Sequence, residues 1–286
     1  MPRPTPEGPG ADPVIRSPSN AGLKYVRSLQ RRQKRYAERA FVVEGDRAIE
    51  DGLLAGAVPT LLLVREDRVE TEPEWLRSLR PQVPTRIVAS ALFDDVGNTV
   101  TPQGTLAVFP FAEVPEASTR SPLYVVIDRV RDPGNLGTLL RAAVGAGVTA
   151  VLLSDETVDP YHPKAVRAGM GAHFRIPIAS LHSDRRASLE ATCPLRALAA
   201  ADGLVPYEGL DWTQPAALIL GSEADGVTTD AASLATTSVR IPLLGGLESL
   251  NVGVAGAVML FEAARQRRRG PRRGARPGPS PGTALP

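Results

Sequence analysis

Three short segments in the second half of the chain carry the residue types best suited to chemistry. They are Asn135-Leu136-Gly137-Thr138-Leu139-Leu140-Arg141, then Leu220-Gly221-Ser222-Glu223-Ala224-Asp225-Gly226, and finally Ile241-Pro242 with Glu248-Ser249-Leu250-Asn251-Val252. Their amide, hydroxyl and carboxylate groups can form hydrogen bonds with a ligand. Their glycines, which lack a Cβ, let a ligand approach the backbone closely. Together the segments predict one binding site built from loops, with an arginine placed for chemistry.

Each of these side chains also has an ordinary structural role open to it. Asn135, Ser249 or Asn251 can cap a helix, because Asn and Ser side chains accept hydrogen bonds from backbone N–H groups. Arg141 can form a salt bridge between helices, and Glu223 can pair with an arginine. The second segment can be a simple turn at the end of a strand. The residues alone leave these alternatives open.

The elements around the three segments alternate between strands and helices. A continuous apolar run at 124–127 predicts a strand that is buried on both faces. Further strands are expected at 149–153, 174–178, 195–199, 217–220 and 239–241, with helices at about 135–145, 163–169 and 250–267. This alternation predicts a parallel sheet with helices on both faces. Ligands bind such sheets beyond the carboxyl ends of the strands, where all three segments lie.

The first part of the chain predicts a second, smaller α/β unit. Strands are expected at 41–43, 60–64, 86–88 and 105–109, and helices at about 45–55 and 72–79. Asn20 is expected to cap a basic helix that runs toward Arg32. Changes in composition divide the chain into a disordered tail at 1–16, this unit at 17–110, a Pro-rich linker at 111–122, the parallel-sheet unit at 123–268 and a basic disordered tail at 269–286.

Charge is unevenly spread along the chain, although its formal net value is only +2. One basic run near the N-terminus includes Lys24, Arg27, Arg31, Arg32, Lys34 and Arg35, and another lies in the last 22 residues. Clusters of this kind are typical of proteins that bind a polyanion such as nucleic acid. A solvated helix face and a disordered tail are the alternative interpretation.

Several function classes are disfavoured by what the sequence lacks. Cys193 is the one cysteine among 286 residues, so a disulfide within the chain is excluded and a cytoplasmic location is expected. The three histidines have no spacing typical of metal ligands, so no metal site is expected. No apolar run is long enough for a membrane span. The segment from Gly145 to Ala150 fits a dinucleotide fingerprint only in reverse, which favours a helix C-cap and disfavours a nucleotide-binding oxidoreductase.

The order and spacing of the three segments resemble those of a known family. Asn135-x-Gly137-x-x-x-Arg141, Gly221-Ser222-Glu223-x-x-Gly226 and Ser249-Leu250-Asn251-Val252 are similar to the signature motifs of the SpoU (TrmH) family. These proteins are S-adenosyl-L-methionine-dependent RNA ribose 2′-O-methyltransferases of the SPOUT class. Phe41-Val42-Val43-Glu44-Gly45 resembles part of the family's ribosomal-protein-like substrate-binding domain. The resemblance implies a trefoil knot in the C-terminal SPOUT domain and a homodimer whose active site is shared across the interface.

The resemblance also implies roles for individual residues. Arg141, Asn135, Glu223, Ser249 and Asn251 are expected to form the catalytic site. Leu198, Ala199, Leu220, Gly221, Glu223, Ile241, Leu250 and Asn251 are expected to hold S-adenosyl-L-methionine. The basic run from Lys24 to Arg35 is expected to contact RNA phosphates.

The chemistry that the resemblance assigns to Arg141 has two possible forms. A guanidinium has a pKa above about 12 and is a poor base in water, so proton abstraction requires strong desolvation or neighbouring positive charge. Otherwise the arginine positions the phosphate and stabilises the developing alkoxide.

The function expected from the resemblance is ribose 2′-O-methylation of RNA. The expected substrate is large-subunit ribosomal RNA. A transfer-RNA 2′-O-methyltransferase is the alternative within the same class of enzyme. A catalytically silent RNA-binding or ribosome-assembly protein is the alternative outside it. Binding of S-adenosyl-L-methionine distinguishes the enzyme from the silent protein.

Overall fold

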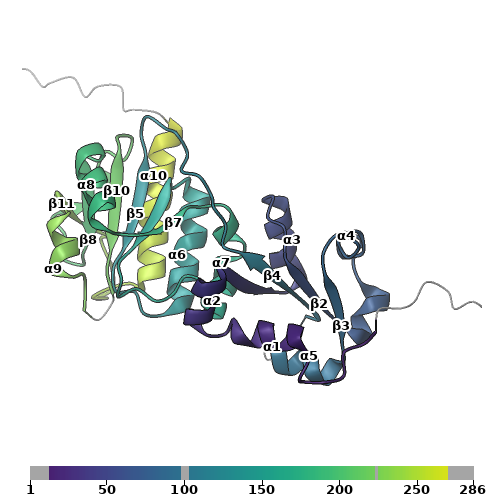
Figure 1. The fold of residues 1–286 in the computed structure, drawn as a ribbon. Helices are drawn as coiled ribbons and strands as arrows, with labels where there is room; N and C mark the ends of the chain where they lie inside the picture. Colours follow the sequence, from purple (N-terminus) through teal and green to yellow (C-terminus); the bar gives the residue numbers. More distant parts are fainter. Residues whose placement is uncertain (1–12, 98–102, 223–224, 270–286) are drawn as a thin grey trace, which may run out of the picture.

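The computed structural model describes residues 13–97, 103–222 and 225–269, which form two α/β units side by side (Figure 1). The first unit is built on a four-stranded mixed sheet and the second on a seven-stranded parallel sheet. The two units follow each other in the chain, and residues 111–122 connect them without helix or strand. The fold therefore has the expected class, a parallel-sheet domain preceded by a smaller α/β domain.

The N-terminal sheet has the strand order β1-β4-β2-β3, with β2 and β3 parallel and the other two pairs antiparallel. Its elements are α1 (Ala21–Ser28), α2 (Arg32–Glu38), β1 (Ala40–Glu44), α3 (Asp46–Leu54), β2 (Leu61–Arg65), the 3-10 helix η1 (Glu66–Thr71), α4 (Glu74–Leu79), β3 (Thr85–Val88), α5 (Ser90–Val96) and β4 (Thr105–Pro110). Both faces of the sheet are apolar and covered: Phe41 and Val43 pack into one cluster and Val42 into the other. Such two-sided burial explains why these strands are continuously apolar.

The basic segment near the N-terminus forms two helices, and the prediction of one helix from Asn20 toward Arg32 was wrong. Asn20 does cap α1, since its side chain accepts from the Gly22 N–H at 2.8 Å. The helix ends at Ser28, and one Arg35 guanidinium nitrogen donates to the Leu29 and Gln30 oxygens just beyond it, each at 2.7 Å. These oxygens would otherwise lack partners at the helix end.

The described part of the expected N-terminal tail, residues 13–16, is ordered against β3. The Ile15 N–H donates to the Ile87 oxygen at 2.8 Å, and the Ile15 oxygen accepts from the Ala89 N–H at 3.1 Å. Ile15 is also buried in a core cluster. The prediction of disorder is therefore wrong for these four residues; most of the two expected tails lies outside the described residues.

The C-terminal sheet is parallel throughout, in the order β7-β6-β5-β10-β8-β11-β9. Its elements are β5 (Leu123–Ile127), α6 (Pro133–Ala146), β6 (Ala150–Leu153), α7 (Pro163–Gly169), η2 (Ala172–Phe174), β7 (Ile178–Ser180), α8 (Ser183–Thr192), β8 (Leu195–Ala199), β9 (Val205–Pro206), η3 (Tyr207–Gly209), β10 (Ala216–Leu220), α9 (Thr229–Ser233), β11 (Thr237–Arg240) and α10 (Val252–Arg269). Helices α6 and α10 cover one face, and α8 and α9 the other (Figure 1).

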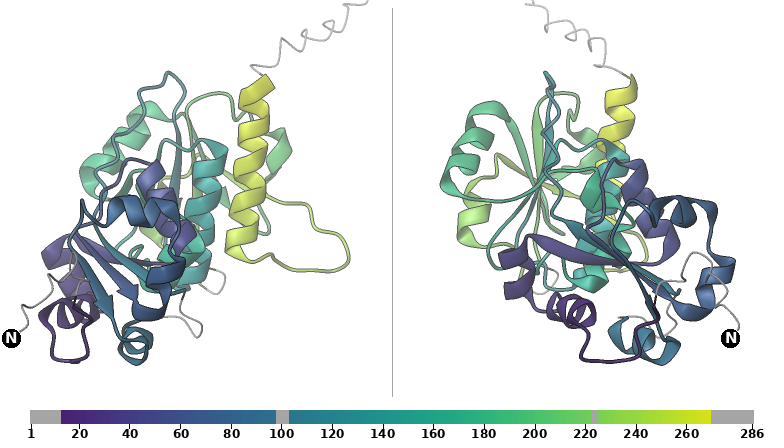
Figure 2. Two further views of the ribbon diagram at one scale, coloured as in Figure 1. Left: turned by 90° about the vertical axis from the view of Figure 1, so that its right-hand side faces the viewer. Right: turned by 45° about the vertical axis from the view of Figure 1, so that its right-hand side comes forward.

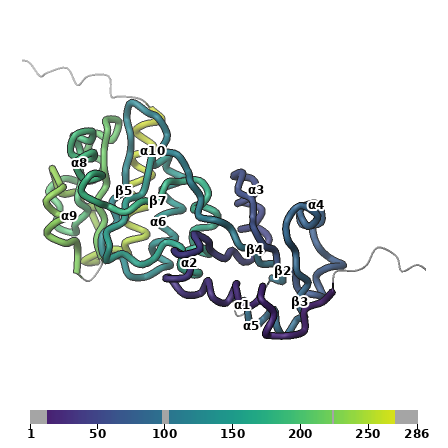
Figure 3. Tube along the Cα trace, viewed as in Figure 1, coloured from purple at the N-terminus to yellow at the C-terminus, as the bar shows by residue number. Residues whose placement is uncertain are grey.

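Strand β10 lies in the middle of this sheet, although it follows β8 and β9 in the chain. It pairs with β5 on one side and β8 on the other. The chain therefore returns through the centre of the sheet late in the domain, and its path can be followed in Figure 3. This return is compatible with the knotted path that the resemblance implies.

The two units share one hydrophobic cluster. Figure 2 shows two further views of the backbone of both units. Tyr161 and Phe174 of the second unit lie among side chains of the first, and the Tyr161 ring stacks on Phe111 with centroids 3.8 Å apart. The Phe174 centroid lies 4.8 Å from that of Phe109. The strand expected at 174–178 begins only at Ile178, because Phe174 lies in a 3-10 turn and packs against the N-terminal unit.

A buried ion pair lies beside this aromatic cluster. Arg35 of α2 pairs with Asp159, and their side chains are 3% and 5% exposed. The Tyr36 hydroxyl donates to the same carboxylate at 3.2 Å. Because a buried charge is costly unless it is paired, the two units are fixed against each other by polar as well as apolar contacts.

Candidate functional site

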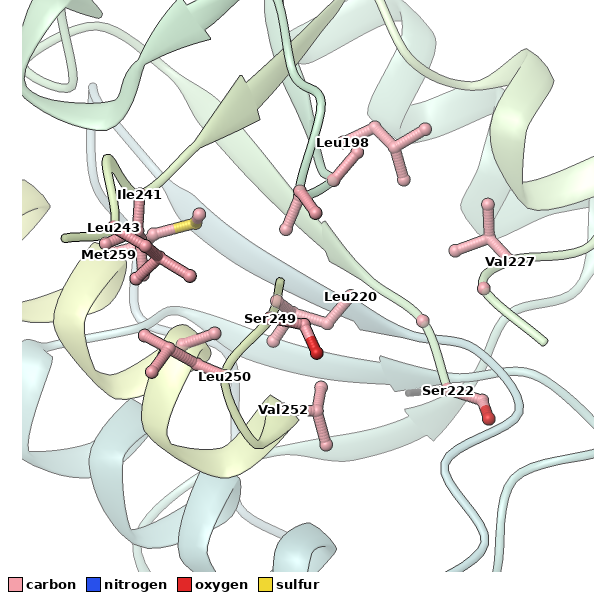
Figure 4. A pocket seen from close by; sticks show the side chains of 16 residues that line it. Leu198, Leu220, Ser222, Val227, Ile241, Leu243, Ser249, Leu250, Val252 and Met259 are labelled. Carbon is pink, nitrogen blue, oxygen red and sulfur yellow. The ribbon is translucent and has the colours of Figure 1, made fainter. Parts of the chain in front are cut away.

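A cavity of about 330 Å³ opens at the carboxyl ends of the central strands (Figure 4). The register explains its position, because β10 ends opposite β5 at Leu220 and Ile127, and β8 ends opposite β11 at Ala199. The loops that leave β8, β10 and β11 form its walls, together with the first turns of α10. Parallel sheets bind ligands at this edge because loops and backbone groups converge there.

Six of the eight residues expected to hold the cofactor line this cavity. They are Leu198, Ala199, Leu220, Gly221, Ile241 and Leu250. Ser249, expected in the catalytic site, lines it as well. Asn251 is not part of the wall, and Glu223 lies outside the described residues. The sequence thus predicts the place of the cavity through the residues at its strand ends.

The cavity wall also contains residues that were not among the eight expected cofactor contacts. They are Ala200, Ala201, Ser222, Gly226, Val227, Leu243, Val252, Ala255 and Met259. Three of them, Ala200, Ser222 and Val252, directly follow a predicted residue in the chain. Ala255 and Met259 lie one and two turns into α10, and the signal available for them was the helical spacing from Asn251. The described lining residues carry no charged side chain, so a bound ligand would meet mainly apolar groups, hydroxyls and backbone.

A tight turn forms one wall of the cavity, and Gly221 makes it possible. Ser222 and Gly226 exchange backbone hydrogen bonds of 2.9 and 3.0 Å. A Cβ on Gly221 would lie 2.5 Å from the Gly226 carbonyl carbon, which is closer than real contacts allow. Gly226 has a φ of +63°, a conformation that glycine adopts without strain. The glycines of the second motif therefore shape the turn itself.

Two of the expected catalytic residues meet at the starts of two parallel helices. The Asn251 side-chain amide donates to the Asn135 side-chain oxygen at 3.0 Å. The Asn251 oxygen in turn accepts from the Gly253 and Val254 N–H groups, at 3.0 and 3.3 Å, and so caps α10. The structure thus brings the first and third motifs together through one amide–amide hydrogen bond.

The helix that carries Asn135 begins earlier than expected, and Asn135 is not its cap. Asp132 caps α6, because its carboxylate accepts from the Asn135 backbone N–H at 2.9 Å, and Pro133 starts the helix. Lys164 of α7 also donates to this carboxylate at 2.6 Å. Both hydrogen bonds, with that of Lys164 contributing most, lower the pKa of Asp132 below its usual value. The Asn135 side chain is thereby left available for Asn251.

Arg141 lies on the exposed face of α6 rather than in the cavity wall. It shares this face with Thr138 and Gly145, and forms no ion pair or hydrogen bond with residues that the structure describes. The adjacent helix α10 packs alongside, with Phe261 next to Gly145. A salt bridge to another described helix is therefore not its role. Within one chain, the structure does not bring Arg141 into contact with the Asn135–Asn251 pair.

Ion pairs and a hydrogen bond connect the loop before α6 with the loop of the second motif. Arg129, at a left-handed φ of +60°, and Arg131 approach Asp225 at 3.5 and 3.1 Å. The buried Asp128 carboxylate accepts from the Thr228 N–H at 2.5 Å. These contacts fix the turn that forms the cavity wall against the loop that leads into α6.

The residues expected to contact RNA divide into three groups. Lys24, Arg31 and Arg32 are exposed, and none forms an ion pair with the residues described. Arg27 pairs with Asp95 at 2.6 Å and Lys34 with Glu38 at 2.5 Å, both at the surface. Arg35 is buried against Asp159, so its prediction as an RNA contact was wrong. Its charge stabilises the contact between the two units instead.

Among residues 13–97, 103–222 and 225–269, no three His, Cys, Asp or Glu side chains gather as metal ligands would. Within the same ranges, no helix combines the length and apolar character that crossing a membrane requires.

Comparison with known proteins identifies the family to which the chain belongs. Residues 122–261 match the model of the SpoU rRNA Methylase family. The match spans all three motifs, and relatives more than 30% identical extend it over most of the chain. The chain belongs to the SpoU family. Residues 20–107 match a second model, the MRM3-like substrate binding domain, so both units of this SpoU protein have counterparts.

Curated relatives of this SpoU protein are similar over most of its length. It is 34% identical to the 23S rRNA (guanosine(2553)-2'-O)-methyltransferase RlmP of Bacillus subtilis, over 86% of this chain and 97% of the relative. It is 32% identical to the human mitochondrial rRNA methyltransferase 3, over 79% of this chain and 68% of the relative. Both similarities include the two units.

The fold of this SpoU protein also matches solved structures. The AdoMet-bound rRNA methyltransferase of Sinorhizobium meliloti superposes with a TM-score of 0.76 and 30% identity, covering 90% of this chain and 98% of the other. The arrangement of a SPOUT domain and a preceding substrate-binding domain is thus common to both proteins.

Proposed function

We propose that this protein transfers the methyl group of S-adenosyl-L-methionine to a ribose 2′-hydroxyl of large-subunit ribosomal RNA. The observation that carries the proposal is the cavity at the carboxyl ends of β8, β10 and β11, lined by residues of the second and third SpoU motifs. The names of the relatives, which include 23S and mitochondrial rRNA methyltransferases, favour ribosomal RNA over transfer RNA.

The residues of the cavity fit S-adenosyl-L-methionine. The turn that Gly221 makes possible forms one wall of the cavity, and the small side chains from Ala199 to Ala201 leave room for a flat group. Leu198, Ile241 and Leu250 supply apolar contact, and Ser222 and Ser249 supply hydroxyls. When bound, the cofactor supplies a methyl group on a cationic sulfur, which needs an aligned nucleophile and no metal.

The protein's own contribution is then mainly to position the ribose. The Asn135–Asn251 hydrogen bond holds two amide side chains at the adjoining starts of α6 and α10. Helix N-termini favour anions, because their N–H groups and dipole point outward. A phosphate next to the target ribose would be held at this point, with its 2′-hydroxyl directed toward the cavity. Alignment of this kind accounts for a large part of enzymatic rate enhancement.

We propose further that two copies of the chain form the complete site. Arg141 is exposed on α6, and the neighbouring helix α10 exposes Val254 and Phe261, of which Phe261 lies next to Gly145 on the Arg141 face of α6. Large exposed apolar side chains next to each other are typical of protein interfaces. In a symmetric dimer, Arg141 of one copy can reach the ribose held by the other. Sedimentation of the wild type and of Phe261→Glu tests this: the wild type is expected as a dimer and the variant as a monomer.

The experiment that tests the reaction is a map of ribose methylation. Ribosomal and transfer RNA are compared from cells with and without the protein, and the lost methyl group is restored in vitro with purified protein and S-adenosyl-L-methionine. Loss at one position of large-subunit ribosomal RNA supports the proposal. Loss in transfer RNA corrects the substrate. If no site is lost and the protein does not bind S-adenosyl-L-methionine, the proposal fails and a silent RNA-binding protein remains.

A further inference from the structure

A second groove is lined by residues of both units. Its volume is about 540 Å³, and it is open to solvent on one side. Its walls include Gln30 and Arg32 of the N-terminal unit and Arg131, Asp155, Glu156 and His162 of the C-terminal unit. Neither the family match nor the three motifs assign a role to this groove.

The carboxylates of the groove are mostly neutralised from within the protein. Glu156 lies 3.2 Å from Arg129, and Asp159 is paired with Arg35. Asp155 is exposed and forms no ion pair with the described residues. One free negative charge therefore remains on this surface.

Two arginines in the groove wall, Arg32 and Arg131, have exposed side chains. Arg32 is exposed and lies over the Tyr36 ring, 5.4 Å from its centroid, without a carboxylate partner among the described residues. Arg131 is 65% exposed, and its one described partner is Asp225, at 3.1 Å. Ion pairs at the surface contribute little because both partners stay hydrated, so an incoming anion can replace Asp225 with little loss. The groove thus has one exposed arginine on each wall, Arg32 on the N-terminal unit and Arg131 on the C-terminal unit.

The position of Arg131 connects this groove to the candidate reaction site. It directly precedes Asp132, the residue that caps α6 and bonds to the Asn135 N–H. Its partner Asp225 directly precedes Gly226, which lines the cofactor cavity. A strand lying in the groove would therefore pass beside the residues that hold the target ribose.

We propose that this groove binds the RNA backbone next to the target nucleotide, with Arg131 and Arg32 contacting its phosphates. On binding, Arg131 exchanges the Asp225 carboxylate for a phosphate. A guanidinium suits this exchange because its planar donors match carboxylate and phosphate oxygens equally well. Contacts of this kind fix the position of the strand without reading its sequence, so Arg131 is a positioning residue. The inference rests on the proposed RNA methylation.

The test measures the RNA affinity of the full-length protein and its dependence on salt. The probe is an unmodified transcript of large-subunit ribosomal RNA, and S-adenosyl-L-methionine affinity is measured in parallel. Arg131→Ala and Arg32→Ala are each expected to weaken RNA binding roughly ten-fold and to reduce the salt slope by about one. The matched control is Arg86→Ala, an exposed arginine on β3 at the opposite edge of the N-terminal sheet, which should bind as the wild type does.

Two further variants separate this role from a merely structural one. If Arg131 acted only by bracing the Asp225 turn, Asp225→Asn would weaken RNA binding as Arg131→Ala does. On the proposal, Asp225→Asn frees Arg131, and Asp155→Asn removes a repelling charge, so both variants bind RNA at least as tightly as the wild type. Weaker RNA binding by Asp225→Asn, or unchanged binding by Arg131→Ala, overturns the proposal.

Failure of this inference is distinguishable from failure of the proposed function. A wild-type protein that binds RNA and methylates it, with Arg131→Ala equally active and equally tight, refutes the groove alone. A wild-type protein that neither binds S-adenosyl-L-methionine nor methylates RNA refutes the function on which the groove depends.

Discussion

Asn135 and Asn251 are separated by 116 positions, yet one hydrogen bond joins their side chains. An asparagine can donate and accept at once, and Asn251 uses both abilities: it caps α10 with its oxygen and holds Asn135 with its nitrogen. The residue types and spacing predicted that the two belong to one site. They did not predict that Asp132 would cap α6 and leave Asn135 available for this contact.

Arg141 provides the sharpest test at this scale. On the proposed dimer, Arg141→Ala removes a cation from the developing oxyanion and is expected to lower the methylation rate by at least about 100-fold. Binding of S-adenosyl-L-methionine, measured by calorimetry, should be unchanged, since Arg141 does not line the cavity. Arg141→Lys keeps the positive charge but lacks the planar guanidinium, so its methylation rate should lie between those of the wild type and Arg141→Ala. Near-normal turnover of Arg141→Ala would refute the catalytic assignment.

His173 makes the stability of the protein depend on pH. Burial lowers its pKa from 6.5 to about 4. Between these values the unfolded chain binds a proton that the folded protein does not, so the free energy of unfolding decreases as the pH falls from about 6.5 to about 4. The full decrease is roughly 3 kcal/mol.

Urea unfolding across this pH range measures the effect. The control is His173→Gln, which keeps a side-chain N–H for the Pro160 oxygen that lies 2.7 Å from the His173 ring nitrogen but does not titrate. The free energy of unfolding of His173→Gln should lack the decrease that His173 causes as the pH falls. An identical pH slope in both proteins would contradict the assignment to His173.

At the scale of elements, the parallel sheet and its site edge follow from the sequence because long apolar runs and the polar residues after them are local signals. The failures have tertiary causes. The split of the basic helix depends on Arg35, whose carboxylate partner lies 124 positions away. The apolar segment from Phe174 serves the contact between units rather than the sheet. No local sequence pattern shows that Arg35 forms a buried ion pair or that Phe174 packs against the other unit.

Gly221 is the element-scale test, because it sets the turn between β10 and the cavity. Gly221→Ala places a Cβ 2.5 Å from backbone, so the turn must open. We expect S-adenosyl-L-methionine affinity to fall about ten-fold or more, corresponding to strain of at least about 1.4 kcal/mol. Gly209→Ala is the control, since its added Cβ would meet only the end of the Val205 side chain at 3.2 Å. Equal affinities in the two variants would contradict this account of the turn.

At the scale of the whole molecule, the two units behave as one body because they share a core. Asp159→Ala leaves Arg35 buried without its carboxylate, and should lower the free energy of unfolding by about 3–5 kcal/mol. The control is Asp95→Ala, which removes the exposed partner of Arg27. This variant should change the free energy of unfolding by less than about 1 kcal/mol. Denaturant titration followed by circular dichroism measures both. A similar small change in the two variants would mean that the buried pair does not hold the units together.

The shared core has a consequence for the way the chain is made. The N-terminal unit leaves the ribosome first, with the aromatic face around Phe41, Phe109 and Phe111 uncovered. The side chains that cover it, up to Phe174, follow roughly 60 residues later, which at about 5–20 residues per second is a delay of several seconds. During that interval the nascent chain presents an apolar patch to its surroundings. Synthesis rate between residues 111 and 174, and chaperones that bind such patches, should therefore influence how much of the protein reaches its folded state.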